Sequence, residues 1–129
     1  MRQYYTFRPE TKSVNKIKKL RSVAREEYSS QLKKYFVEAI KTQGVKHFST
    51  PVGLSINIKG SKRDLDNDLL GFFKELQDSL VITGVIRDDC KKHVRRITVD
   101  MEEHEDYQVD LIIKSLWKDQ MPWSTRLKK

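Results

Sequence analysis

Residues 52–59 read Val-Gly-Leu-Ser-Ile-Asn-Ile-Lys, and this run decides the fold because its side chains alternate in character. Val52, Leu54, Ile56 and Ile58 would share one face of an extended chain, and the smaller or polar residues between them would share the other. A period of two is the pattern of a strand that is buried on one face only. We therefore predict a half-buried strand here, with helices covering its apolar face.

Helical periodicity appears on both sides of this strand. Apolar residues at helical spacing predict one helix over residues 22–43, which Gly44 ends, and a second helix over residues 65–80. Residues 3–8, 94–101 and 107–113 predict three further strands, and residues 9–21 begin as a loop that lasts at least to Ser13. The last two strands, joined by an acidic turn over residues 102–106, would most simply form an antiparallel hairpin.

These elements give a β-α-β-α-β-β order. This order predicts an α+β fold in which two helices cover a mixed or antiparallel sheet. A chain of 129 residues, 37% of them hydrophobic, is expected to form one domain. We assign residues 1–113 to that domain and residues 114–129 to a basic tail that contains Trp117 and Trp123.

Charge is distributed unevenly along the chain, which has a formal net charge of +8. Residues 1–63 hold 15 Lys and Arg against 4 acidic residues, whereas residues 64–129 hold 11 against 14. An excess of clustered cations is typical of proteins that bind a polyanion such as DNA. Clusters of cations stand at three places in the sequence: Lys16, Lys18, Lys19 and Arg21; Lys62 and Arg63; and Lys91, Lys92, Arg95 and Arg96.

The acidic residues that matter most stand between these basic clusters. The run Lys62-Arg63-Asp64-Leu65-Asp66-Asn67 is followed by a second acidic motif, Arg87-Asp88-Asp89, after a gap long enough to form a helix. Neighbouring carboxylates repel one another, and a divalent cation such as Mg²⁺ or Mn²⁺ offsets that repulsion. Taken singly, Asp64 or Asp66 would serve as a helix N-cap, and Asp88 and Asp89 would lie in a solvated turn. Together they predict a shared metal site.

The same residues resemble the signature of the RusA-type Holliday junction resolvases. The resemblance is specific over residues 62–89, where Asp-Leu-Asp-Asn, an amphipathic helix and Gly84-Val85-Ile86-Arg87-Asp88-Asp89 follow in order. It implies that Asp64, Asp66 and Asp89 are the catalytic, metal-binding carboxylates, with Asp88 as the alternative third ligand. It also implies a homodimer that cuts four-way DNA junctions with Mg²⁺, or Mn²⁺, as cofactor.

One departure from the family bears on catalysis. Family members carry a Lys four residues after the second Asp, and this chain has Leu70 at that position. Lys74, one helical turn later, would lie on the same side of the predicted helix as Asp66 and is our candidate for the missing catalytic lysine. Its alternative role is that of an exposed Lys beside Glu75 and Asp78.

The sequence therefore predicts a Mg²⁺-dependent endodeoxyribonuclease that acts on branched DNA, with the three basic clusters binding the phosphate backbone. Two alternatives stay open: a DNA-binding protein of the same fold that has lost catalysis, and a general nuclease on branched or single-stranded DNA. We expect no nucleotide cofactor, because no glycine-rich phosphate loop is present. A single Cys and the lack of a long apolar run predict an intracellular, cytoplasmic protein without membrane contact.

Overall fold

The computed structural model describes residues 1–88 and 93–116. The chain forms a single α+β domain, as predicted. Its elements in chain order are β1 (Arg2–Phe7), α1 (Val14–Lys18), α2 (Ser22–Gln43), β2 (Val52–Lys59), α3 (Leu65–Leu69), α4 (Phe73–Ile82), β3 (Val94–Glu102) and β4 (Gln108–Ser115).

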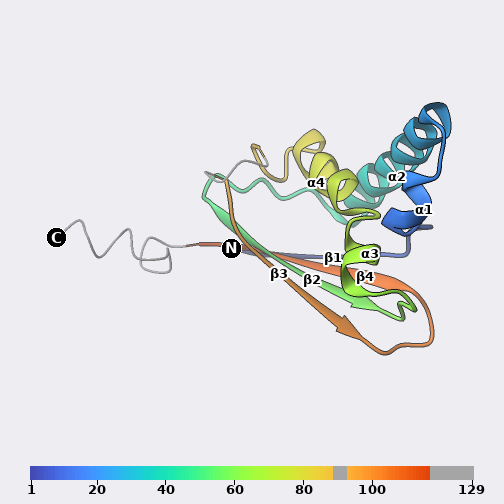
Figure 1. Cartoon of the computed structure of the whole chain (residues 1–129). Coiled ribbons are helices and arrows are strands. Elements are labelled where there is room, and N and C mark those ends of the chain that lie inside the picture. The colour runs from blue at the N-terminus through green and yellow to red at the C-terminus, as the bar shows by residue number, and fades with distance from the viewer. Residues whose placement is uncertain (89–92, 117–129) are drawn as a thin grey trace, which may run out of the picture.

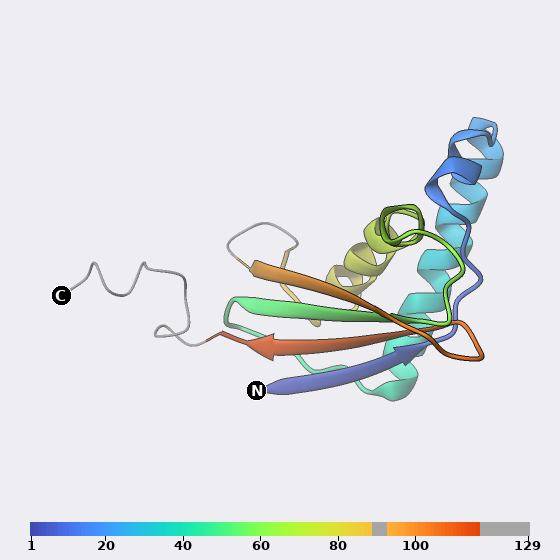
Figure 2. The same ribbon diagram turned by 60° about the horizontal axis from the view of Figure 1, so that its bottom comes forward.

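The four strands form one mixed sheet in the order β1-β4-β2-β3. β4 runs antiparallel to both of its neighbours, whereas β2 and β3 are parallel. The described helices gather on one face of this sheet, and none of them covers the other face (Figures 1 and 2). The half-buried strand predicted over residues 52–59 is confirmed, because Val52, Leu54, Ile56 and Ile58 are buried while Ser55 is exposed.

The predicted hairpin of the last two strands is wrong. β3 and β4 follow one another in the chain, but β2 lies between them in the sheet. Burial explains the arrangement: Val109, Leu111 and Ile113 of β4 are fully buried, whereas most of β3 is exposed. An apolar strand takes a central position, and a strand rich in charge is suited to an edge.

The single helix predicted over residues 65–80 is also wrong, because it is broken into α3 and α4. The break is centred on Gly71, whose missing side chain lets the Lys12 carbonyl approach closely. The Gly71 carbonyl accepts a hydrogen bond of 2.6 Å from the Tyr28 hydroxyl instead of continuing the helix. A tertiary contact therefore overrides a helical pattern of apolar residues.

The parallel pairing of β2 with β3 determines which residues lie at each end of the sheet. Val52 lies opposite Val94, and Lys59 lies opposite Glu102. α3 begins just beyond the end of β2, and α4 brings the chain back to the end of the sheet at which both parallel strands start. Because β2 has eight residues at ~3.3 Å each, these two ends lie about 25 Å apart.

The core lies between the sheet and the helices. Phe7 of β1 contacts Phe36 of α2 edge-on at 5.0 Å between ring centroids, and Phe36 also contacts Phe72. β4 continues through Lys114 and Ser115, which we had assigned to the tail, and Ser115 N–H donates to the Met1 carbonyl. Among residues 1–88 and 93–116, no helix has both the length and the apolar character needed to cross a bilayer.

Candidate functional site

Asp64 and Asp66 lie at the start of α3, after the loop that follows β2. Asp64 is the N-cap residue of α3 with an extended backbone, φ −67° and ψ 155°, and Asp66 stands in the first turn. The Asp64 side chain makes no capping hydrogen bond, and both carboxylates are exposed. The capping role therefore describes the backbone of Asp64 but leaves its carboxylate available for a ligand.

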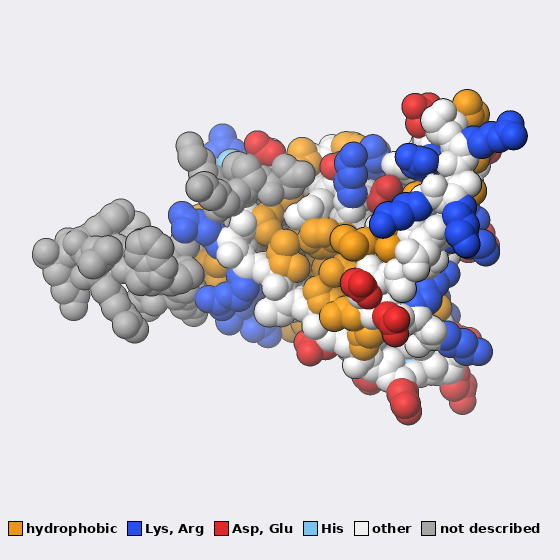
Figure 3. All heavy atoms as spheres, in the orientation of Figure 1, with side chains coloured by type: hydrophobic (Ala, Val, Ile, Leu, Met, Phe, Trp, Pro, Cys, Tyr) orange, Lys and Arg blue, Asp and Glu red, His pale blue; other side chains and the backbone are white. Residues whose placement is uncertain are grey.

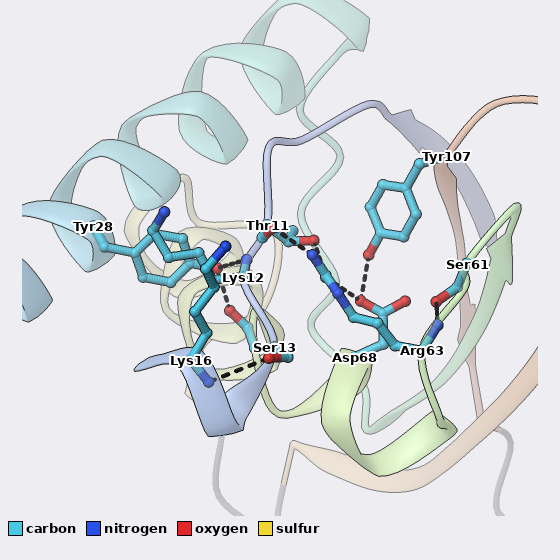
Figure 4. Close-up of polar contacts among 10 residues, drawn as sticks. Thr11, Lys12, Ser13, Lys16, Tyr28, Ser61, Arg63, Asp68 and Tyr107 are labelled. Carbon is cyan, nitrogen blue, oxygen red and sulfur yellow. Dashed lines mark hydrogen bonds and ion pairs between the residues drawn. The ribbon is translucent and has the colours of Figure 1, made fainter. Parts of the chain in front are cut away.

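A third acid of the same segment, Asp68, is fully buried and was missed from the sequence. Its Oδ1 accepts hydrogen bonds from Arg63 Nη1 at 3.1 Å and from the Tyr107 hydroxyl at 2.9 Å (Figure 4). Its Oδ2 is buried and has no hydrogen-bond partner among the described residues. A usable signal was present: Asp68 interrupts the apolar positions Leu65, Leu69 and Phe72 at helical spacing, where a charged residue is expected only with a buried partner.

Arg63 connects this acid to the rest of the fold. Its guanidinium donates to the Thr11 carbonyl at 2.8 Å and to the Thr11 hydroxyl at 2.9 Å as well as to Asp68. The loops after β1, after β2 and after β3 thus meet at one polar cluster, which we call the Asp68 cluster: Thr11, Arg63, Asp68 and Tyr107. The cluster holds in place the start of α3, which carries Asp64 and Asp66.

The environment of the Asp68 cluster raises the pKa of the Tyr107 phenol. Burial is the main cause that raises the pKa of the Tyr107 phenol, and the charge of Asp68 raises that pKa further. The hydrogen bond with Thr11 and the charge of Arg63 act in the opposite direction and do not cancel the rise. The phenol therefore stays protonated and donates its hydrogen bond to Asp68.

The structure does not bring Asp88 to this site within one chain. Asp88 precedes β3 at the other end of the parallel pair, and with Lys33, Asp78, Val81 and Ile82 it lines a shallow hollow beside α4. Asp89, our first choice for the third ligand, lies outside the described residues. Among the described residues, no three His, Cys, Asp or Glu side chains form a group that would hold a metal.

Lys74 is exposed in the first turn of α4. Our expectation that it shares a helix side with Asp66 depended on one continuous helix, and the break at Gly71 removes that argument. Leu70, which stands at the family's lysine position, is 58% exposed at the end of α3.

The basic residues fall at both ends of the molecule (Figure 3). Lys16, Lys18, Lys19 and Arg21 are exposed on and just after α1, which lies against α3 and hence beside Asp64 and Asp66. Lys62 is exposed next to them, whereas Arg63 turns inward to the Asp68 cluster. Arg95 and Arg96 are exposed near the start of β3, at the opposite end, and Lys91 and Lys92 lie outside the described residues.

Neither the protein-family models nor the curated proteins include a match to this chain.

Proposed function

We propose that this protein is a metal-dependent endonuclease of branched DNA, acting on four-way junctions as do the RusA-type resolvases that its acidic motif resembles. One observation carries the proposal: the exposed carboxylates of Asp64 and Asp66 adjoin the basic helix α1. Carboxylates are the ligands that Mg²⁺ and Mn²⁺ prefer. Cations beside them draw the phosphate backbone toward acids that would otherwise repel it.

Asp64 and Asp66 fit a divalent cation in part. Both supply oxygen ligands, and the Asp64 carboxylate is not used for capping. No third described acid joins them, so a site with three carboxylates is incomplete within the described part of one chain. When bound, Mg²⁺ would activate water for attack on phosphorus and stabilise the charge that develops.

A second copy of the chain is the source of the third carboxylate in this proposal. Residues before β3 and residues after β2 lie at opposite ends of the parallel pair in one chain. A two-fold axis that reverses the strand direction brings the start of β3 in one subunit beside the end of β2 in the other. The two-fold homodimer also offers one site to each of the two strands that a resolvase must cut.

The proposal is tested on a four-way junction and a linear duplex of matched arm sequence, each with Mg²⁺ or with EDTA. We expect paired cleavage of the junction that EDTA abolishes. Asp64→Asn and Asp66→Asn should each remove cleavage and leave junction binding intact or tighter, because a charge near phosphate is lost. Full cleavage by either variant would remove that residue from the site.

Mixing two inactive variants tests whether the site is shared between subunits. Asp64→Asn and Asp88→Asn, mixed and allowed to exchange subunits, should regain cleavage, because the heterodimer contains one site with both carboxylates intact. A site formed within one chain predicts no recovery. If Asp88→Asn is active by itself and Asp89→Asn is inactive, the third ligand is Asp89 and the mixture is repeated with that variant.

A second candidate function is junction binding without catalysis. The observation in its favour is Leu70, an exposed apolar residue where the family carries its lysine. If Lys74 supplies the missing charge, Lys74→Ala should slow cleavage by about 10²-fold with little change in binding. Tight, junction-selective binding by the unmodified protein, with no cleavage in Mg²⁺ or Mn²⁺, would instead establish the binding function. Equal cleavage of flaps, single strands and junctions would indicate a general nuclease.

A further inference from the structure

The two edges of the sheet differ in how far other described residues cover them. At the β1 edge, the Gln43 side chain accepts from Thr6 N–H at 2.8 Å and donates to the Thr6 carbonyl at 2.7 Å. The Tyr35 hydroxyl accepts from Arg8 N–H just beyond. Nothing comparable covers β3, which has no strand on its outer side within the described residues. An edge without cover is a template for pairing with another strand.

The area around the β3 edge is also apolar. Ile97, Val99 and Met101 lie in register with Leu54, Ile56 and Ile58, so they point to the helix-covered face. Within the described residues no helix covers Ile97 or Met101, which remain 43% and 39% exposed. Leu65 and Leu70 of α3 are exposed as well, and Figure 3 shows apolar side chains running over the middle of this face. Exposed apolar surface beside an open edge marks an interface.

The sequence of β3 is complementary to itself in the antiparallel direction. When two copies pair about a two-fold axis at Thr98, Arg96 stands opposite Asp100 of the partner subunit, and Ile97 stands opposite Val99 of the partner subunit. Directly opposite side chains of opposite charge, and of apolar character, stabilise antiparallel pairs. The charges on this edge therefore complement those of a second copy instead of preventing association.

We infer that two copies of this chain associate through their β3 edges, antiparallel and centred on Thr98, to form one continuous sheet of two subunits. The inference deepens the proposed function and rests on it only for the role of the acids. In this register Val94 of the partner subunit lies opposite Glu102, which is itself paired with Lys59. The start of β3 in the partner subunit therefore lies at the end of the sheet where β2 ends, just before the loop that carries Asp64.

Disulfide trapping tests the register. Thr98 lies on the axis, and directly opposite residues of antiparallel strands have Cα atoms about 4.5–5.5 Å apart, within the range that a disulfide spans. In a Cys90→Ser background, Thr98→Cys should give a covalent dimer in high yield on mild oxidation. Ser30→Cys, exposed on α2, is the control and should stay monomeric under denaturing electrophoresis. Equal yields from the two positions would overturn the register.

Charge reversal tests the interface without any covalent bond. Arg96→Glu and Asp100→Arg should each shift the protein toward monomer in sedimentation without DNA, and the double variant should recover the dimer. A monomeric parent protein, or a dimer that all three variants leave unchanged, would overturn the inference whatever the nuclease assays give. A dimer that behaves as expected but never cleaves DNA would retain this interface and refute the proposed nuclease.

Discussion

Asp68 and Asp64 show how differently two acids of one short helix are used. Asp64 is exposed at the N-cap position, whereas Asp68 is fully buried against Arg63 and Tyr107. The burial of a charge costs free energy unless it is paired and hydrogen-bonded. The Asp68 cluster meets that requirement at Oδ1 by joining three loops, and in doing so it fixes the position of the exposed acids.

Removal of one partner from the Asp68 cluster should destabilise the fold strongly. Asp68→Ala leaves the Arg63 guanidinium without its counter-charge, and we expect a loss of about 3 kcal/mol in the free energy of unfolding, measured with urea. Asp78→Ala is the control, because its pair with Lys33 is partly exposed and should change stability by less than about 1 kcal/mol. Similar losses in the two variants would contradict the role given to Asp68.

Tyr107 should make the protein sensitive to alkali. Its folded pKa is raised above the ordinary value of 10.0, so the folded state retains the phenolic proton at a pH where the unfolded state has lost it. The stabilisation is fully present below pH 10 and is lost as pH rises from there toward the folded pKa. Thermal unfolding from pH 8 upward should therefore show a shallower alkaline decline for Tyr107→Phe than for the unmodified protein. Superimposable declines would show that this phenol is not responsible.

At the scale of elements, the break between α3 and α4 allows α3, which carries Asp66, to be oriented independently of α4. A continuous helix over residues 65–80 would carry Lys74 on the side of Asp66, but Gly71 stops the first helix after one short turn. The Tyr28 hydroxyl and the Lys12 carbonyl meet the chain at this point. α3 therefore takes its orientation from α2 and from the loop after β1, and not from α4.

Gly71→Ala should be costly because of this close approach. A Cβ at position 71 would clash with the Lys12 carbonyl, which is backbone and has little room to move. We expect a loss of about 2 kcal/mol in the free energy of unfolding, within the range for overpacking in a core. Gly53→Ala is the control, because its added Cβ would meet only ordinary contacts at 3.7 Å. Equal stability of the two variants would mean that the break has another cause.

At the scale of the whole molecule, the position of the basic groups predicts how the proposed DNA binding would respond to salt. Lys16 and Lys18 of α1 lie beside the exposed acids. If each of them neutralises one phosphate of a duplex arm, the Lys16→Ala, Lys18→Ala double variant should reduce the slope of log K against log salt by about 1.8. Lys41→Ala, exposed in the last turn of α2, should leave the slope unchanged. An unchanged slope in the double variant would remove α1 from the DNA surface.

Local pattern predicted the elements well where burial follows a simple period. The alternation of residues 52–59 placed β2, and the apolar spacing of residues 22–43 placed α2, because the buried side chains of each segment meet one face of the fold. The α+β class follows from the order of such segments. Asp64 and Asp66 were placed at the strand–helix junction for the same reason, since a helix start is encoded locally.

Which strands are neighbours, and which acids meet, was decided only by the tertiary structure. β4 lies inside the sheet because Val109, Leu111 and Ile113 are fully buried only with a neighbouring strand on each side. β3 is therefore left at an edge, parallel to β2. The parallel register then placed the start of β3, which Asp88 precedes in the sequence, about 25 Å along the strands from the end at which Asp64 lies, from eight residues at ~3.3 Å each. The sequence by itself determined most of the elements and the positions of Asp64 and Asp66, because periodicity and capping act over a few residues. Their distances depend on competition among strands for buried positions, which acts over the whole chain.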